Sequence, residues 1–136
     1  MIRLLTLSAL LCALWVPSAL AQDAPDYKPL VGVWMWRPAQ QTGGGATDIW
    51  SAQLTIEDVS DTGLVTAVWK DPHWGTIHFT TQAWMKEGTI RLTFGGRTKY
   101  HLEYDKRTDM LIGPLTDLPP KYVTGGWTKA YFYRTR

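Results

Sequence analysis

Apolar and polar side chains alternate along the chain from residue 30 onward, between short runs rich in Gly, Pro and Asp. A two-residue period is typical of strands with one buried and one solvated face, and no stretch after residue 21 has the period of an amphipathic helix. The pattern therefore predicts an all-β protein with eight short strands. We expect them at residues 30–37, 51–59, 64–70, 76–85, 89–94, 98–104, 110–115 and 127–134.

The lengths of the predicted turns determine which residues share a face of the sheet. A two-residue turn at Glu87 and Gly88, for example, places the alternate residues before and after it on the same side. Applied to each turn in succession, this rule extends one apolar face from the second strand to the seventh. Its members are Leu54, Ile56, Val65, Ala67, Trp69, Ile77, Phe79, Ala83, Met85, Ile90, Leu92, Phe94, Tyr100, Leu102, Tyr104, Met110 and Ile112.

A sheet with only one apolar face must cover that face, either by closing on itself or by packing against a second layer. The sequence contains no spare helix that could supply the second layer. We therefore expect an eight-stranded antiparallel up-and-down barrel. A barrel of this size has an interior that side chains can fill or that can hold one small ligand.

The first 21 residues have the pattern of a secretory signal peptide. Arg3 precedes an apolar run at residues 4–16, and Ala19 and Ala21 provide the small residues of a cleavage site. We expect residues 1–21 to be the signal, 22–29 a leader segment and 30–136 the barrel domain of a periplasmic or secreted protein. The single cysteine, Cys12, lies in the signal, so the mature chain is expected to form no disulfide.

The charge balance bears on the partners of the protein. Without Arg3, 13 Lys and Arg stand against 12 Asp and Glu, and no long run of like charge occurs, which argues against a nucleic-acid partner. No apolar run after residue 21 approaches the roughly 18 residues of a membrane span. Seven Trp, six Tyr and three Phe remain after cleavage, so aromatic side chains dominate the chemistry of the chain.

The first and last predicted strands carry a short pattern. Gly32, Val33 and Trp34 open the first strand, and Arg134 ends the last. This resembles the calycin superfamily of lipocalin-like and avidin-like barrels, in which a Gly-x-Trp of the first strand packs near an Arg or Lys of the last. The resemblance implies a structural motif of Gly32, Trp34 and Arg134, with a guanidinium–indole contact of ~0.5–2 kcal/mol. It also implies binding of a small, often apolar molecule.

Alternating strand direction places the loops at residues 38–50, 71–75, 95–97 and 116–126 at one end of the barrel, the expected mouth for a ligand. We expect three polar residues at this end, Arg97, Lys121 and Tyr122, to provide contacts for the head group of a ligand. In the alternative interpretation, the aromatic side chains simply fill a narrow barrel and its rim. The expected ligand-binding residues are Trp36, Trp50, Trp69, Trp74, Ile77, Phe94, Arg97, Tyr100, Lys121, Tyr122 and Trp127.

Catalytic and metal-binding patterns are not found in the sequence. His78 and His101 fall on the predicted outer face, whereas His73 lies in a mouth loop, so the three imidazoles do not converge. None of the familiar hydrolase, metalloprotease or phosphate-binding motifs is present. We expect no catalytic residue, no metal and no cofactor.

The leading hypothesis is an exported barrel that binds a small apolar or amphiphilic molecule at its aromatic mouth, without catalysis. An alternative is a protein-interaction or enzyme-inhibitor module of the cell envelope that inserts residues 23–29 or a mouth loop into its partner. A third hypothesis is an enzyme of the cyclase or isomerase kind. Such an enzyme needs an acid or base inside the cavity, where the predicted inner face offers only tyrosines.

Overall fold

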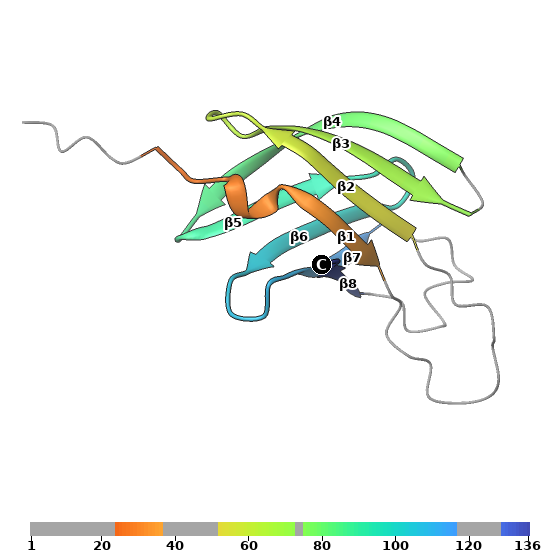
Figure 1. Ribbon diagram of the computed structural model, residues 1–136. Coiled ribbons are helices and arrows are strands. Elements are labelled where there is room, and N and C mark those ends of the chain that lie inside the picture. Colours follow the sequence, from red (N-terminus) through yellow and green to blue (C-terminus); the bar gives the residue numbers. More distant parts are fainter. Residues whose placement is uncertain (1–23, 37–51, 73–74, 117–128) are drawn as a thin grey trace, which may run out of the picture.

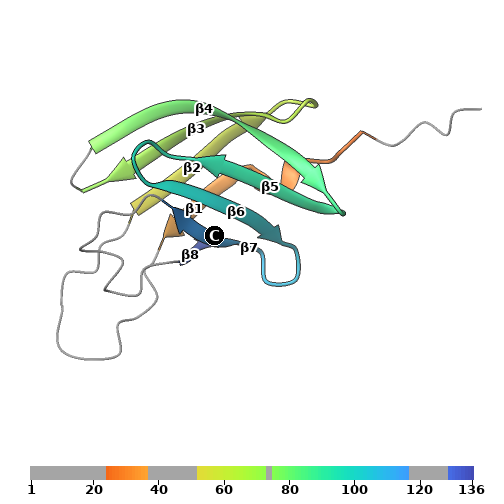
Figure 2. The ribbon, with the colours of Figure 1, turned by 180° about the vertical axis from the view of Figure 1, so that it is seen from behind.

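Eight antiparallel strands close into a barrel in sequence order, with β8 paired to β1 (Figures 1 and 2). The computed structural model describes residues 24–36, 52–72, 75–116 and 129–136. The predicted fold class is confirmed. A 3-10 turn, η1 (Lys28–Leu30), precedes the strands β1 (Gly32–Trp36), β2 (Ala52–Val59), β3 (Leu64–Asp71), β4 (Gly75–Lys86), β5 (Thr89–Phe94), β6 (Lys99–Asp105), β7 (Met110–Thr116) and β8 (Lys129–Arg134).

The predicted strands agree with the observed ones to within two residues wherever the chain is described. The largest difference is at the start of the first strand, where Leu30 lies in η1 and β1 begins at Gly32. Pro29 accounts for this difference, since its fixed backbone angle suits the first turn of a helix. Residues 37, 51, 127 and 128, which were also expected in strands, lie outside the described part of the chain.

The inner face of the barrel is apolar, as the alternation predicts. In Figure 1, β2 to β4 form the upper wall of the barrel and β6 to β8 the lower wall. Trp34, Leu54 and Phe132 are among the side chains with no exposed surface. The buried cluster also includes Ile56, Val65, Ala67, Trp69, Ala83, Ile90, Leu92, Phe94, Leu102, Leu111, Leu115 and Ala130.

The prediction of which β7 residues face inward is wrong. Met110 and Ile112 are only half-buried, whereas Leu111 and Leu115 are buried in the core. The reason lies in the turn between β6 and β7, where Asp105 pairs with Met110 so that four residues, not five, remain in the turn. A shift of one residue moves every side chain of a strand to the other face.

β4 separates from β5 at one end of the barrel. It pairs with β3 from Gly75 to Gln82, but with β5 only from Ala83 to Lys86. Beyond that ladder the Thr81 hydroxyl donates to the Thr93 carbonyl oxygen at 2.6 Å. From Gly75 to Gln82, β4 therefore has a backbone ladder to β3 but none to β5.

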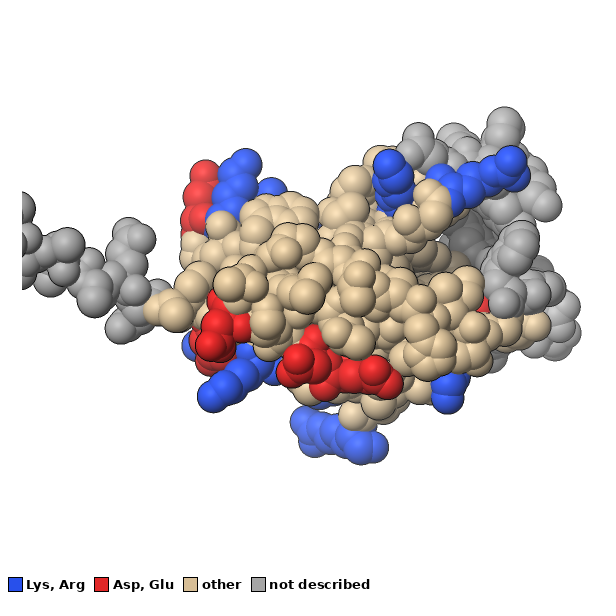
Figure 3. Space-filling model, turned by 90° about the horizontal axis from the view of Figure 1, so that it is seen from above, with Lys and Arg blue, Asp and Glu red and all other residues tan. Residues whose placement is uncertain are grey.

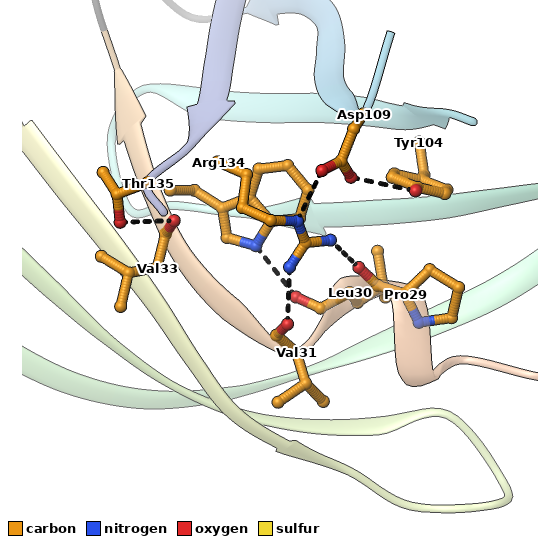
Figure 4. Close-up of polar contacts among 9 residues, drawn as sticks. Pro29, Leu30, Val31, Val33, Tyr104, Asp109, Arg134 and Thr135 are labelled. Carbon is orange, nitrogen blue, oxygen red and sulfur yellow. Dashed lines mark hydrogen bonds and ion pairs between the residues drawn. The ribbon is translucent and has the colours of Figure 1, made fainter. Parts of the chain in front are cut away.

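Arg134 closes the opposite end of the barrel (Figure 4). Its Cζ atom lies 4.1 Å from the centre of the Trp34 ring. Nε donates to Asp109 Oδ2 at 2.8 Å, Nη1 donates to the Val31 carbonyl oxygen at 2.7 Å, and Nη2 donates to the Pro29 carbonyl oxygen. One guanidinium thus joins β8, the β6–β7 turn and the segment before β1.

Gly32 and Trp34 complete the arrangement that the calycin resemblance implies. Gly32 has a φ of 146°, and a Cβ atom there would lie 2.5 Å from Arg134 Nη1. Only glycine accepts both this backbone angle and this approach. The Trp34 indole donates to the Leu30 carbonyl oxygen at 2.9 Å, which fixes η1 beneath the barrel.

The leader residues that the structure describes also contribute to this end. Tyr27 and Leu30 are buried members of the core cluster, whereas Ala24, Pro25 and Asp26 are exposed. The Tyr27 side chain is therefore part of the barrel's packing. Within the described residues, no helix has the length and apolarity needed to cross a lipid bilayer.

Candidate ligand site at the mouth of the barrel

The mouth is the end of the barrel opposite Arg134. β1 and β3 end there at Trp36 and Asp71, and β4 begins there at Gly75. Of the four loops expected at this end, the β5–β6 turn after Phe94 is described in full. The site can therefore be built from the strand ends and this turn.

Five aromatic side chains pack together just inside the mouth, and we call them the aromatic layer. Phe79 stacks on Phe94 with ring centres 5.4 Å apart, and Phe94 stacks on Tyr100 at 4.9 Å with an angle of only 8°. Trp69 lies against Phe94 and Tyr100 at 5.7 and 5.5 Å, and Trp36 meets Tyr100 edge-on at 6.3 Å. These are the separations at which aromatic pairs attract.

The interior below the aromatic layer is occupied by side chains. Phe132 has no exposed surface, and its ring lies 5.8–6.2 Å from those of Trp69, Phe94 and Tyr100. At this depth the rings fill the barrel, as the alternative interpretation of the aromatic residues expects. A bound molecule would have to lie between the aromatic layer and the mouth.

Asp71 places a carboxylate on the inner face near the mouth, beside the aromatic layer. It is the last residue of β3 and lies on the same face as Trp69, two residues earlier. Its exposed fraction is 9 %, and it is the only charged side chain classed as buried among the described residues. Burying a carboxylate has a cost that polar or charged neighbours must offset.

The pKa of Tyr100 is raised in the same environment. Burial of its phenol raises its pKa to about 12, and the nearby Asp71 charge adds to the increase. Both effects disfavour a phenolate, so the hydroxyl stays protonated and can donate a hydrogen bond at the mouth.

We expect the fold to lose stability as the pH rises from 10.0, the ordinary tyrosine pKa, to about 12, because the folded state resists ionisation of Tyr100. Tyr100→Phe should make this loss smaller. The measurement is the urea midpoint of unfolding at about pH 9 and about pH 11.5. Tyr133→Phe, at an exposed position, is the control, and an equal effect of both variants would contradict the prediction.

The structure brings four of the predicted site residues, Trp36, Trp69, Phe94 and Tyr100, into mutual proximity. Ile77 lies on the inner side of β4 near the mouth with 46 % of its surface exposed, and Arg97 is exposed in the β5–β6 turn. The remaining predicted site residues lie outside the described part of the chain, namely Trp50, Trp74, Lys121, Tyr122 and Trp127.

Two residues of the site were missed by the sequence analysis. Phe79 was placed on the inner face but not in the site, although it stacks on Phe94. Asp71 was assigned to a loop, because the predicted strand ended at Lys70. Continuing the alternation for two residues beyond Trp69 would have placed the Asp71 carboxylate on the inner face.

The described histidines lie away from the mouth interior. His78 is exposed on β4, and His101 makes its contacts on the outer face, to Thr93 Oγ1 at 3.3 Å and to Thr116 Oγ1 at 2.9 Å. Within the described ranges, no group of three or more His, Cys, Asp or Glu could hold a metal ion.

Comparison of the chain with protein-family models, with curated proteins and with solved structures finds no match. The fold and the side-chain contacts are therefore the basis for assigning a function. They define an eight-stranded antiparallel barrel with a packed interior and an aromatic layer near one end.

Proposed function

We propose that this protein is an exported, calycin-like barrel that binds a small apolar or amphiphilic molecule at its mouth and catalyses no reaction. The calycin assignment is supported by the contacts of Gly32, Trp34 and Arg134 at the closed end. Export is supported by the signal-peptide pattern of residues 1–21, with Arg3 before the apolar run and Ala21 at the cleavage site.

The observation that carries the binding proposal is the exposure of inward-facing apolar surface beside the aromatic layer. Ile77 is on the inner side of β4 yet 46 % exposed, and the neighbouring Phe79 is only half-buried. We place the ligand on this surface of Ile77 and Phe79. Seen from above, most of the described surface of the molecule carries neither Lys and Arg nor Asp and Glu (Figure 3).

The energy available on such a surface is sufficient for measurable binding. Burial of ~200 Å² of apolar ligand surface contributes about 5 kcal/mol before the costs of ordering are subtracted. Flat aromatic ligands gain further from stacking against the ring faces. We therefore expect affinities in the range of about millimolar to micromolar for small aromatic molecules.

The inhibitor alternative receives less support from the leader. Tyr27 is buried in the core cluster, so its side chain is engaged in the barrel and is not displayed to a partner. The three exposed residues before it, Ala24, Pro25 and Asp26, offer little apolar surface for insertion. The leader therefore supports ligand binding at the mouth better than insertion of residues 23–29 into a partner.

The test is isothermal titration calorimetry with naphthylmethanol and with decanol, two uncharged molecules with apolar bodies. We expect saturable binding with one molecule per chain. Ile77→Ser should weaken the affinity about fivefold, because it removes apolar contact area without opening the core.

Leu64→Ser is the matched control. Leu64 is also about half exposed, at 49 %, but it lies at the start of β3, away from the mouth. This variant should bind as the wild type does. The proposal fails if neither probe binds saturably, or if the Leu64 variant loses as much affinity as the Ile77 variant.

A further inference from the structure

The buried Asp71 carboxylate affects the charge of the ligands that the mouth can bind. The sequence led to the expectation that Arg97 and other polar side chains contact a head group, which favours an anionic ligand. Arg97, however, is exposed in the β5–β6 turn, whereas Asp71 is buried on the inner face beside Trp69. Among the described residues, the charged side chain buried on the inner face beside the aromatic layer is therefore negative.

We propose that the mouth selects molecules with a protonated amine attached to an aromatic or apolar body, and that Asp71 binds the ammonium group. This inference rests on the proposed binding function and specifies the chemical class of the ligand. The apolar body would contact the surface formed by Ile77 and Phe79, and the ammonium group would reach the carboxylate.

The surroundings of Asp71 suit a cation for two reasons. First, the faces of nearby aromatic rings, Tyr100 and Trp69 among them, carry partial negative charge that attracts a cation. Second, a carboxylate offers about four acceptor positions on its two oxygens, so Asp71 can bind an ammonium group in addition to the contacts it makes within the chain.

The exposed basic side chains near the mouth have a weaker effect on ligand charge. Arg97 and Lys99 are both exposed, so water and salt screen them over about 10 Å at ordinary ionic strength. Asp71 is buried, and the lower effective dielectric there makes its attraction for a cation stronger at equal distance.

The test compares naphthylmethylamine, naphthylmethanol and naphthylacetate, which share one aromatic body and differ in charge, by isothermal titration calorimetry at neutral pH. In the wild type we expect the amine to bind about tenfold more tightly than the alcohol, and the acid to bind most weakly. Asp71→Asn should weaken binding of the amine about tenfold and so remove its preference over the alcohol.

Asp61→Asn is the control for a general change in charge. Asp61 is exposed in the β2–β3 turn at the closed end, so this variant should keep the preference for the amine. The comparison of the three ligands on the wild type tests the charge selectivity even if Asp71→Asn fails to fold. Binding of the alcohol or the acid as tightly as the amine overturns the charge selectivity but leaves the proposed function standing. Absence of binding by all three overturns both.

Discussion

Gly113→Ala is expected to lower the free energy of unfolding by about 3 kcal/mol or more. A Cβ atom at this position would overlap the carbonyl oxygen of His101 and lie 3.0 Å from the Cα atom of Leu102. Both are backbone atoms of β6, so no side-chain rotation relieves the contact. The strand itself must move.

A displacement of β6 opposite Gly113 would also change the mouth of the barrel. On one side of Gly113 the ladder between β6 and β7 pairs Glu103 with Ile112, and on the other it pairs Tyr100 with Leu115. Pro114 follows Gly113 and has no N–H to donate, so the ladder has little capacity to compensate. We expect the variant to shift Tyr100 and thereby loosen the aromatic layer.

The measurement is urea unfolding followed by tryptophan fluorescence. Gly96→Ala is the matched control, because a Cβ atom at Gly96, in the exposed β5–β6 turn, would meet nothing within 4 Å. It should change the free energy by no more than about 0.5 kcal/mol. Equal unfolding midpoints for Gly113→Ala and the wild type would show that β6 and β7 do not approach so closely in solution.

Arg134→Met should lower the free energy of unfolding by about 2–4 kcal/mol. The substitution removes the hydrogen bonds to the Pro29 and Val31 carbonyl oxygens and the stacking on Trp34, and methionine replaces only the apolar part of the contact. Arg134→Lys should recover a minor part of the loss, since an ammonium group cannot reproduce the planar fork of hydrogen bonds.

The same variant should change the response to acid. The hydrogen bond from Arg134 is the largest cause that lowers the pKa of Asp109 below its ordinary value of 3.8. A lowered carboxyl pKa contributes stability above the unfolded pKa, and this contribution is lost as the pH falls through the folded pKa. Between about pH 5 and about pH 3, the wild type should therefore lose more stability than Arg134→Met.

Urea midpoints at the two pH values measure this difference. Arg97→Met, the same substitution at an exposed position, serves as the control and should follow the wild type at both. If Arg134→Met has the wild-type midpoint at neutral pH, the guanidinium does not secure the closed end in solution.

Much of the barrel could be predicted from the sequence because its cause is local. Alternation along each strand assigns the inner face, and short turns such as that at Glu87 and Gly88 set the pairing of neighbouring strands. The resemblance built on Gly32, Trp34 and Arg134 likewise predicted the contact between the first and last strands, which the structure contains. Of the aromatic residues expected near one end, the four that the structure describes lie together there, namely Trp36, Trp69, Phe94 and Tyr100.

The prediction of the site was less complete, because its features depend on strands that lie far apart in the sequence. Burial of Asp71 follows from what packs around the mouth, and its effect on Tyr100 joins β3 to β6. The exposure of Ile77 on an inner face, in the part of β4 that has no backbone ladder to β5, is likewise a property of the closed barrel. No local pattern carries this information.

The sequence by itself therefore determined the strands, the inner faces of β2 to β6 and the closure of the sheet, since a two-residue period leaves one apolar face that must be covered. Only the tertiary structure decided the inward residues of β7, the close approach at Gly113 and the burial of a carboxylate beside the aromatic layer. These features depend on register and on distances across the barrel, which are set when all eight strands pack together.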